Sequence, residues 1–118
     1  MKSLLLAALL MSSSAFAGTL TIGHKAQDVS PVIKNYVEAV LNNKCAGAFE
    51  EDATVTLEEV SYIILDQGME KEYTAKVKVV SDYGHIVDSI KIEFDEDVYH
   101  GQGFYLYNIS ASAPYLCE

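Results

Sequence analysis

The alternation of apolar and polar positions predicts one helix in this chain. From Ser30 to Lys44, apolar residues recur every three or four positions, which places them on one face of a helix. Ser30 is a favourable N-cap, and Pro31 suits the first helical position. Lys44 falls in the last turn, where a cation complements the helix dipole, and Gly47 lies just beyond. We therefore expect an amphipathic helix that must cover another element.

The chain after this helix has the pattern of β-strands. The segment 54–65 is rich in Val, Leu, Ile and Tyr, and its two-residue alternation slips at Glu58 and Glu59. Such a slip predicts a β-bulge. The segment 73–79 alternates apolar residues with Thr and Lys, as a strand with one buried face does. With a short first strand before the helix, the expected strands lie near residues 19–22, 54–65, 73–79, 86–94 and 104–111.

Two of the expected strands carry side chains in surroundings that the alternation does not explain. Asp88 falls on the same face as Ile90 and Ile92, where no reason for an acid is evident. In the last strand, strict alternation separates Phe104 and Leu106 from a face made of Tyr105, Tyr107, Ile109 and Ala111. That tyrosine-rich face is either covered by the fold or an exposed patch that meets a partner.

The order of these elements predicts the fold class. Strands that follow one another through short turns form an antiparallel meander. One amphipathic helix on one face of such a sheet makes a two-layer α+β domain. The expected architecture is therefore one helix packed on a curved antiparallel meander of four to five strands, within a single domain that spans 18–118.

This arrangement resembles the cystatin-like fold, in which a sheet wraps around a single helix. The resemblance covers the topology of the segment 18–118. The cystatin protease inhibitors carry a Gln-x-Val-x-Gly loop and a Pro-Trp loop. Here the corresponding first loop reads DQGMEKE, and the chain has no Trp. The resemblance therefore implies a fold and does not extend to inhibition of cysteine proteases.

The first 17 residues have the pattern of a secretory signal peptide. Lys2 precedes the apolar run LLLAALLM, and Ala15-Phe16-Ala17 has the small-x-small pattern that signal peptidase cleaves. A transmembrane helix needs about 20 apolar residues, and this run is much shorter. We expect cleavage after Ala17, no membrane span in the exported chain, and a periplasmic or secreted location.

The two cysteines predict a disulfide. Cys45 and Cys117 have no CxxC spacing, and an even pair in an exported chain is typical of one structural bond. Two free thiols are the alternative. Such a bond closes a long loop, for which the chain-entropy model gives about 4 kcal/mol of stabilisation.

The charge balance limits the class of partner. The chain has 8 Lys, no Arg and 17 acidic residues, for a net charge of −9, and removal of Lys2 leaves 7 − 17 = −10. Contact with phosphates needs a basic patch, so nucleic-acid binding is not expected. An acidic surface favours a basic protein partner.

Two acidic loops form the candidate binding site. In a meander alternate turns lie at the same end, so the segments 66–72 and 95–103 are expected side by side, with the turn near Tyr83 at the other end. Tyr and Met among acids suit protein recognition, although solvated turns have a similar composition. The candidate binding residues are Gln67, Met69, Glu70, Asp95, Asp97, Tyr99 and His100.

The same loops were compared with metal-site patterns. Asp95-x-Asp97 begins like an EF-hand loop, but position six holds His100 instead of Gly, and position twelve holds Leu106 instead of Glu. A looser calcium site formed by Asp66, Asp95 and Asp97 is an open alternative, because hard cations prefer carboxylates. Zinc is disfavoured because the three His residues are not expected to gather at one end. No metal or cofactor is assigned.

The motif search favours a non-enzymatic protein. The chain contains no GxSxG, HExxH, Walker or Rossmann motif, so no catalytic residue is assigned. We expect a protein-binding or inhibitor-type module that uses its acidic loop edge against a basic secreted or periplasmic protein. One alternative is a small hydrolase or ligand-binding enzyme that uses His100 and a neighbouring acid, which a pocket between sheet and helix would favour. Another is an envelope component without a site.

Overall fold

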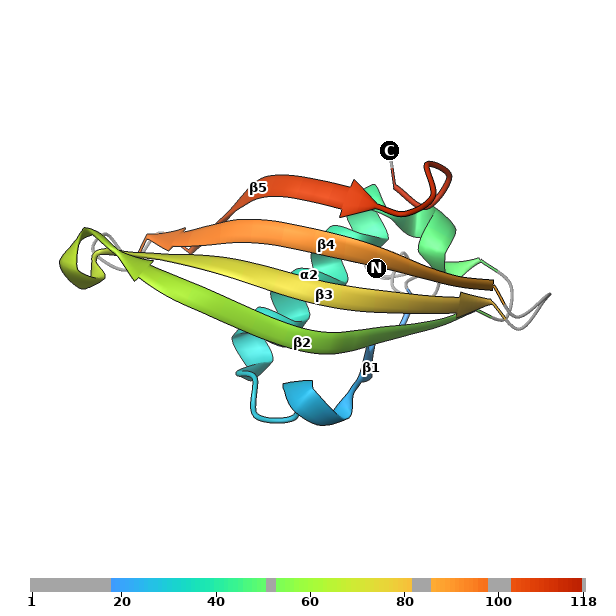
Figure 1. Ribbon diagram of the computed structural model, residues 1–118, viewed down its shortest axis with the longest axis horizontal. Coiled ribbons are helices and arrows are strands. Elements are labelled where there is room, and N and C mark those ends of the chain that lie inside the picture. The colour runs from blue at the N-terminus through green and yellow to red at the C-terminus, as the bar shows by residue number, and fades with distance from the viewer. Residues whose placement is uncertain (1–17, 51–52, 82–85, 98–102, 118) are drawn as a thin grey trace, which may run out of the picture.

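The computed structural model describes residues 18–50, 53–81, 86–97 and 103–117. In these residues one α-helix packs against one face of a five-stranded mixed sheet, which makes an α+β fold (Figure 1). The elements are β1 (Thr21–Ile22), the 3-10 helix η1 (His24–Ala26), α2 (Pro31–Lys44), η2 (Ala46–Phe49), β2 (Thr54–Leu65), η3 (Asp66–Gly68), β3 (Glu70–Ser81), β4 (Ile86–Asp97) and β5 (Phe104–Ala111).

The strands lie in the order β1-β2-β3-β4-β5. Strands β2 to β5 form the expected antiparallel meander. The expectation of an entirely antiparallel sheet is wrong, because β1 pairs parallel to β2, with Thr21 opposite Thr56. The chain between these two strands passes through α2, and a helical crossover returns the next strand in the same direction.

Helix α2 begins and ends where the sequence predicts. Ser30 is its N-cap, and the Ser30 Oγ accepts a hydrogen bond from the Ile33 N–H at 3.3 Å. Its buried residues, Val37, Val40 and Leu41, belong to one core with the inner side chains of the sheet. No helix in the described ranges is long and apolar enough to cross a membrane.

The bulge expected in β2 is confirmed, since the pairing with β3 shifts between Leu57 and Glu59. A second bulge, which strict alternation did not predict, lies in β5. Glu93 pairs with Asn108 and Phe94 pairs with Leu106, so Tyr107 is an extra residue in β5.

The β5 bulge changes which side chains share a face, and the predicted faces of this strand are wrong. Phe104 and Leu106 lie on the same side as Ile109 and Ala111, because these residues pair with inward-facing positions of β4. The Phe104 ring lies 4.9 Å from the Tyr36 ring of α2, centroid to centroid.

The expected disulfide joins the residue after α2 to the segment after β5. Cys45 and Cys117 form a disulfide with an S–S distance of 2.05 Å. The structure also explains Asp88. Its carboxylate accepts hydrogen bonds from the Ser112 hydroxyl at 2.9 Å and from the Tyr115 hydroxyl at 3.0 Å. Asp88 therefore holds the C-terminal segment against the sheet.

Candidate functional site at the loop end of the sheet

The two ends of the sheet differ, and each is named here by its residues. Glu70 pairs with Asp97, so η3 and the start of the β4–β5 connection lie next to each other, and we call this end the loop end. Ser81 pairs with Ile86 at the opposite end. Since the disulfide and the C-terminal segment pack there, we call it the disulfide end.

The β2–β3 turn has an uncommon backbone. Asp66, Gln67 and Gly68 have positive φ angles of 49°, 57° and 94°. Gly adopts this region freely and Asp tolerates it, whereas a Gln residue does so at a cost in free energy. The turn leaves Gln67 and Met69 exposed at the tip of the loop end.

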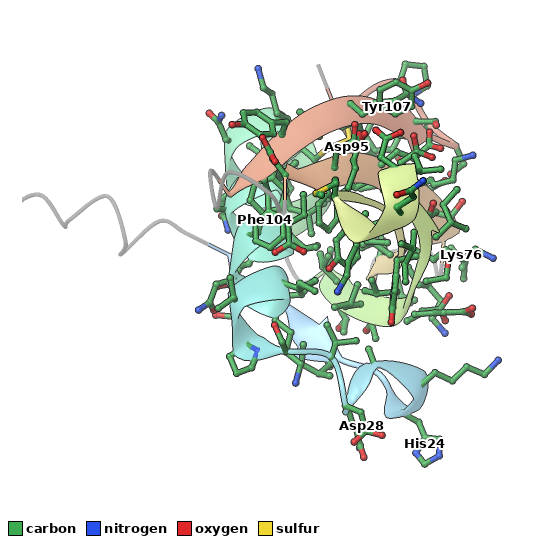
Figure 2. All side chains as sticks on the ribbon, turned by 90° about the vertical axis from the view of Figure 1, so that its left-hand side faces the viewer. His24, Asp28, Lys76, Asp95, Phe104 and Tyr107 are labelled. Atoms are coloured by element: carbon green, nitrogen blue, oxygen red, sulfur yellow. A yellow bond between two sulfur atoms is a disulfide. The ribbon has the colours of Figure 1, made fainter. Side chains whose placement is uncertain are left out.

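Five carboxylates line the uncovered face of β3 and β4 near this turn. Glu70 lies opposite Asp97, and Glu72 lies opposite Asp95. This face is the one opposite to the helix, as Figure 2 shows for Lys76, which points away from α2, whereas Phe104 lies on the helix side. Like charges directly across a strand pair destabilise a sheet. We call this set the acidic ladder: Glu70, Glu72, Glu93, Asp95 and Asp97.

One carboxylate of the acidic ladder, Glu70, has a perturbed pKa. The pKa of Glu70 is raised above its ordinary value by partial desolvation first and then by Asp95, Asp66 and Glu72. The Oδ1 atom of Asp95 is buried and has no hydrogen-bond partner among the described residues. A proton on Glu70 gives Asp95 a donor.

The charge on the uncovered face changes sign along the strands. Beyond the acidic ladder, toward the disulfide end, lie Lys76, Lys78 and Lys91, with Lys76 directly opposite Lys91. Lys78 forms an exposed ion pair with Glu58 at 3.5 Å. The carboxylates of the ladder gather at the loop end, where they concentrate negative potential.

On the opposite face, the loop end has a groove of about 650 Å³ between the sheet and the start of α2. The rings of Tyr62, Tyr73 and Phe104 line it. The Tyr73 hydroxyl donates a hydrogen bond to the Glu96 Oε1 at 2.7 Å, and the pKa of Tyr73 is raised well above its usual range by burial and this carboxylate. The Lys71 Nζ lies 5.2 Å from the centre of the Tyr62 ring.

The structure can be compared with the residues that the sequence nominated. Gln67, Met69, Glu70, Asp95 and Asp97 all lie at the loop end. Tyr99 and His100 lie outside the described residues. Glu96, which was grouped with the acidic loops, instead faces the groove and bonds to Tyr73.

The groove was not nominated from the sequence. Its signal is present in β2, where Val60 and Tyr62 fall on the inner face after the bulge although the helix does not cover them fully. The groove can be recognised only from the length of the strands relative to α2, and the periodicity of the sequence does not give that length. Glu93 was also missed, because it lies four positions before the end of β4 at Asp97, away from the loop.

The calcium alternative has no geometric support. Within residues 18–50, 53–81, 86–97 and 103–117, no three side chains of His, Cys, Asp or Glu are placed to hold a metal ion. Asp66, Asp95 and Asp97 are therefore not assigned as metal ligands.

The chain was compared with known proteins at three levels. No family model, no curated protein sequence and no solved structure matches it. The function must therefore be argued from the site itself.

Proposed function

We propose that this protein is a small, exported, non-enzymatic module that binds a basic protein through the acidic ladder at its loop end. An inhibitor of a basic secreted hydrolase is one form of such a module. The disulfide supports an oxidising compartment, since such bonds persist in periplasmic and secreted proteins. The order of one strand, one helix and four meandering strands supports a cystatin-like arrangement.

The observation that carries the proposal is the register of β3 and β4. Glu70 faces Asp97 and Glu72 faces Asp95 on the face that no described helix covers. This pairing costs folding free energy, because like charges lie directly opposite each other across the strand pair. A Lys- or Arg-rich surface placed over the ladder would offset that repulsion.

The proposal is tested with a defined cationic probe. Titration of the protein with a lysine- and arginine-rich peptide, followed by calorimetry at low and at physiological ionic strength, should show binding that weakens as salt rises. The variant Glu72→Gln with Asp95→Asn should bind at least about tenfold more weakly, because it removes two central charges of the ladder.

The matched control removes the same number of charges elsewhere. Asp28→Asn with Glu50→Gln alters two exposed carboxylates outside the ladder. This variant should bind the cationic peptide almost as tightly as the unmodified protein. Equal weakening by both double variants would mean that the peptide responds only to net charge, and the proposed site would be wrong.

A second candidate function rests on the groove. A hollow lined by Tyr62, Tyr73 and Phe104, with Lys71 at its rim, suits a small ligand that has an aromatic or apolar body. Binding of such a ligand would change the tyrosine fluorescence of the protein and would be lost in Tyr62→Ala, but not in the ladder variant. If neither probe binds, the alternative of an envelope component without a site gains support.

A further inference from the structure

Strand β5 forms one edge of the sheet, and no described strand pairs with its outer side (Figure 1). An edge strand presents unpaired N–H and C=O groups, which natural proteins usually protect with charged residues or proline. The segment Phe104–Ala111 reads FYLYNISA and contains neither. By contrast, β2, β3 and β4 each carry charged residues along their length. The edge strand β5 therefore lacks the usual protection against pairing with another strand.

Two hydrogen bonds show which backbone groups of β5 face the open side. The Ser112 N–H donates to the Ser89 carbonyl at 2.9 Å, and the Asp97 N–H donates to the Gly103 carbonyl at 3.3 Å. In an antiparallel pair, hydrogen-bonded and non-hydrogen-bonded positions alternate from such points. The residues whose backbone groups turn outward are therefore Phe104, Leu106, Ile109 and Ala111.

The bulge interrupts this outward row. Leu106 and Ile109 are three positions apart instead of two, because Tyr107 is the extra residue. A regular strand from an unrelated protein would lose its pairing at this step. A strand with the same bulge, placed antiparallel, would meet it in register.

We propose that β5 pairs antiparallel with β5 of a second copy of this chain, around a two-fold axis between Tyr107 and Asn108. In this register Phe104 faces Ala111 of the second copy, and Leu106 faces Ile109, so all four outward positions are matched. The extra residues of the two strands lie together at the axis. Because the outward positions of β5 match those of a second β5, we infer a second copy as the partner of this edge. The inference does not depend on the proposed function.

Side-chain exposure agrees with this pairing. Tyr107 is 67% exposed and Leu106 is 38% exposed beside the open edge, and Tyr107 stands at the outer rim in Figure 2. Tyr105 would face Ser110 of the second copy. Since Asp95 pairs with Tyr105 and Lys91 pairs with Ser110, Asp95 would then stand in one row with Lys91 of the second copy, about 14 Å away at three strand spacings. The charges in this row are thus of opposite sign, whereas Glu93, which pairs with Asn108 beside the axis, would lie at a similar spacing from Glu93 of the second copy.

The net charge of each copy opposes association. Two chains that each carry −9 repel one another at long range, and the opposite charges in the aligned rows are too far apart to outweigh this. Salt should therefore strengthen the pairing of two copies. This is the reverse of the salt dependence expected for a cationic partner, so failure of one idea can be told from failure of the other.

Sedimentation velocity on the protein, expressed with its complete sequence, tests the proposal. We expect a reversible monomer–dimer equilibrium with a dissociation constant on the order of 10–100 µM, as suits a small interface. Tyr107→Lys should raise this constant at least about tenfold, because two ammonium groups would meet at the axis. Ile63→Lys, which changes an apolar, 56% exposed side chain on β2, should leave this constant unchanged.

Amide hydrogen exchange provides a readout that does not depend on a variant. The Leu106 and Ile109 amides should become protected as the protein concentration rises, whereas the Asn108 and Ser110 amides, which face β4, should be protected throughout. A protein that stays monomeric at millimolar concentration would overturn the proposal. So would equal loss of dimer in Ile63→Lys, or protection of Leu106 and Ile109 only when a different protein is added.

Discussion

The two ends of the sheet differ in how far other parts of the chain cover them. At the disulfide end, Cys45 and Leu116 are buried, and η2 and the C-terminal segment close over the strands. At the loop end, β2 and β3 run past the start of α2, so Tyr62 and Met69 are exposed (Figure 1). One end is covalently tied and covered, and the other is open.

The difference shows where a small domain can carry unfavourable interactions. The acidic ladder and the positive φ angles of Asp66 and Gln67 all lie at the loop end. The disulfide and the bonds of Asp88 lie at the other. A domain of this size has a stability of only about 5–15 kcal/mol, so strain at one end requires strong interactions elsewhere. We expect substitutions at the disulfide end to lower the free energy of unfolding strongly. Substitutions at the loop end should change it little or should raise it.

The largest expected effect comes from removing the disulfide. Replacing Cys45 and Cys117 together with Ser should lower the free energy of unfolding by about 4 kcal/mol, because the bond closes a loop of 72 residues in sequence separation. Denaturant unfolding monitored by circular dichroism measures this. Met69→Ser at the loop end is the contrast and should change the free energy by less than about 0.5 kcal/mol. Similar losses at the two ends would remove the distinction between them.

The next effect concerns packing under the disulfide. Leu116→Ala should cost about 2–4 kcal/mol, because the side chain is 2% exposed and its removal leaves a cavity against the core. Tyr62→Ala at the loop end deletes a larger side chain, yet one that is 54% exposed, and should cost about 1 kcal/mol or less. Thermal and denaturant unfolding of both variants gives the comparison. A Tyr62 variant that loses more stability than the Leu116 variant would show that the groove is part of the structural core.

A smaller effect comes from the hydrogen bonds of Asp88. Asp88→Ala should lower the free energy of unfolding by about 1–2 kcal/mol, since the Ser112 and Tyr115 hydroxyls lose their acceptor. Tyr115→Phe removes one of the two bonds and should cost less. The Asp88 carboxylate raises the pKa of Tyr115, so in Asp88→Asn that pKa should fall toward its ordinary value, as an ultraviolet titration would detect. An unchanged titration would mean that the bond does not form in solution.

These features were accessible from the sequence to different degrees. The helix, its N-cap at Ser30, the bulge near Glu59 and the disulfide were all predicted, because each depends on local pattern or on residue identity alone. The adjacency of the two acidic loops followed from meander topology. The sequence pattern therefore predicted the elements that position the candidate site.

The remaining features depend on non-local geometry. The bulge at Tyr107 was missed because the sequence of β5 can be read as a regular two-residue alternation. Only the pairing with β4 shows that the register shifts by one residue at Tyr107. The role of Asp88 required the position of Tyr115, 27 residues away in the chain. The parallel pairing of β1 depends on how α2 returns the chain. None of these can be read from the periodicity of one segment.

The smallest effect, and the one opposite in sign, is expected at the acidic ladder. Because the pKa of Glu70 is raised in the folded protein above its ordinary value near 4.5, the folded state binds more protons than the unfolded state just above that pH. The contribution of Glu70 to stability is therefore present at low pH and is lost as the pH rises through the folded pKa. Glu70→Gln, which keeps the shape and supplies a donor for Asp95, should be more stable than the unmodified protein at pH 7.

The pH dependence separates this explanation from a general benefit of removing charge. The stability gained by Glu70→Gln should shrink as the pH falls and vanish below about 4, where the glutamate is protonated in both states. Glu50→Gln, an exposed carboxylate at the disulfide end, controls for net charge. Denaturant unfolding of the three proteins from about pH 3 to 8 measures the differences. A Glu70 variant that is less stable at pH 7 would show that the ladder is compensated within the fold, and the loop end would then have no electrostatic need for a cationic partner.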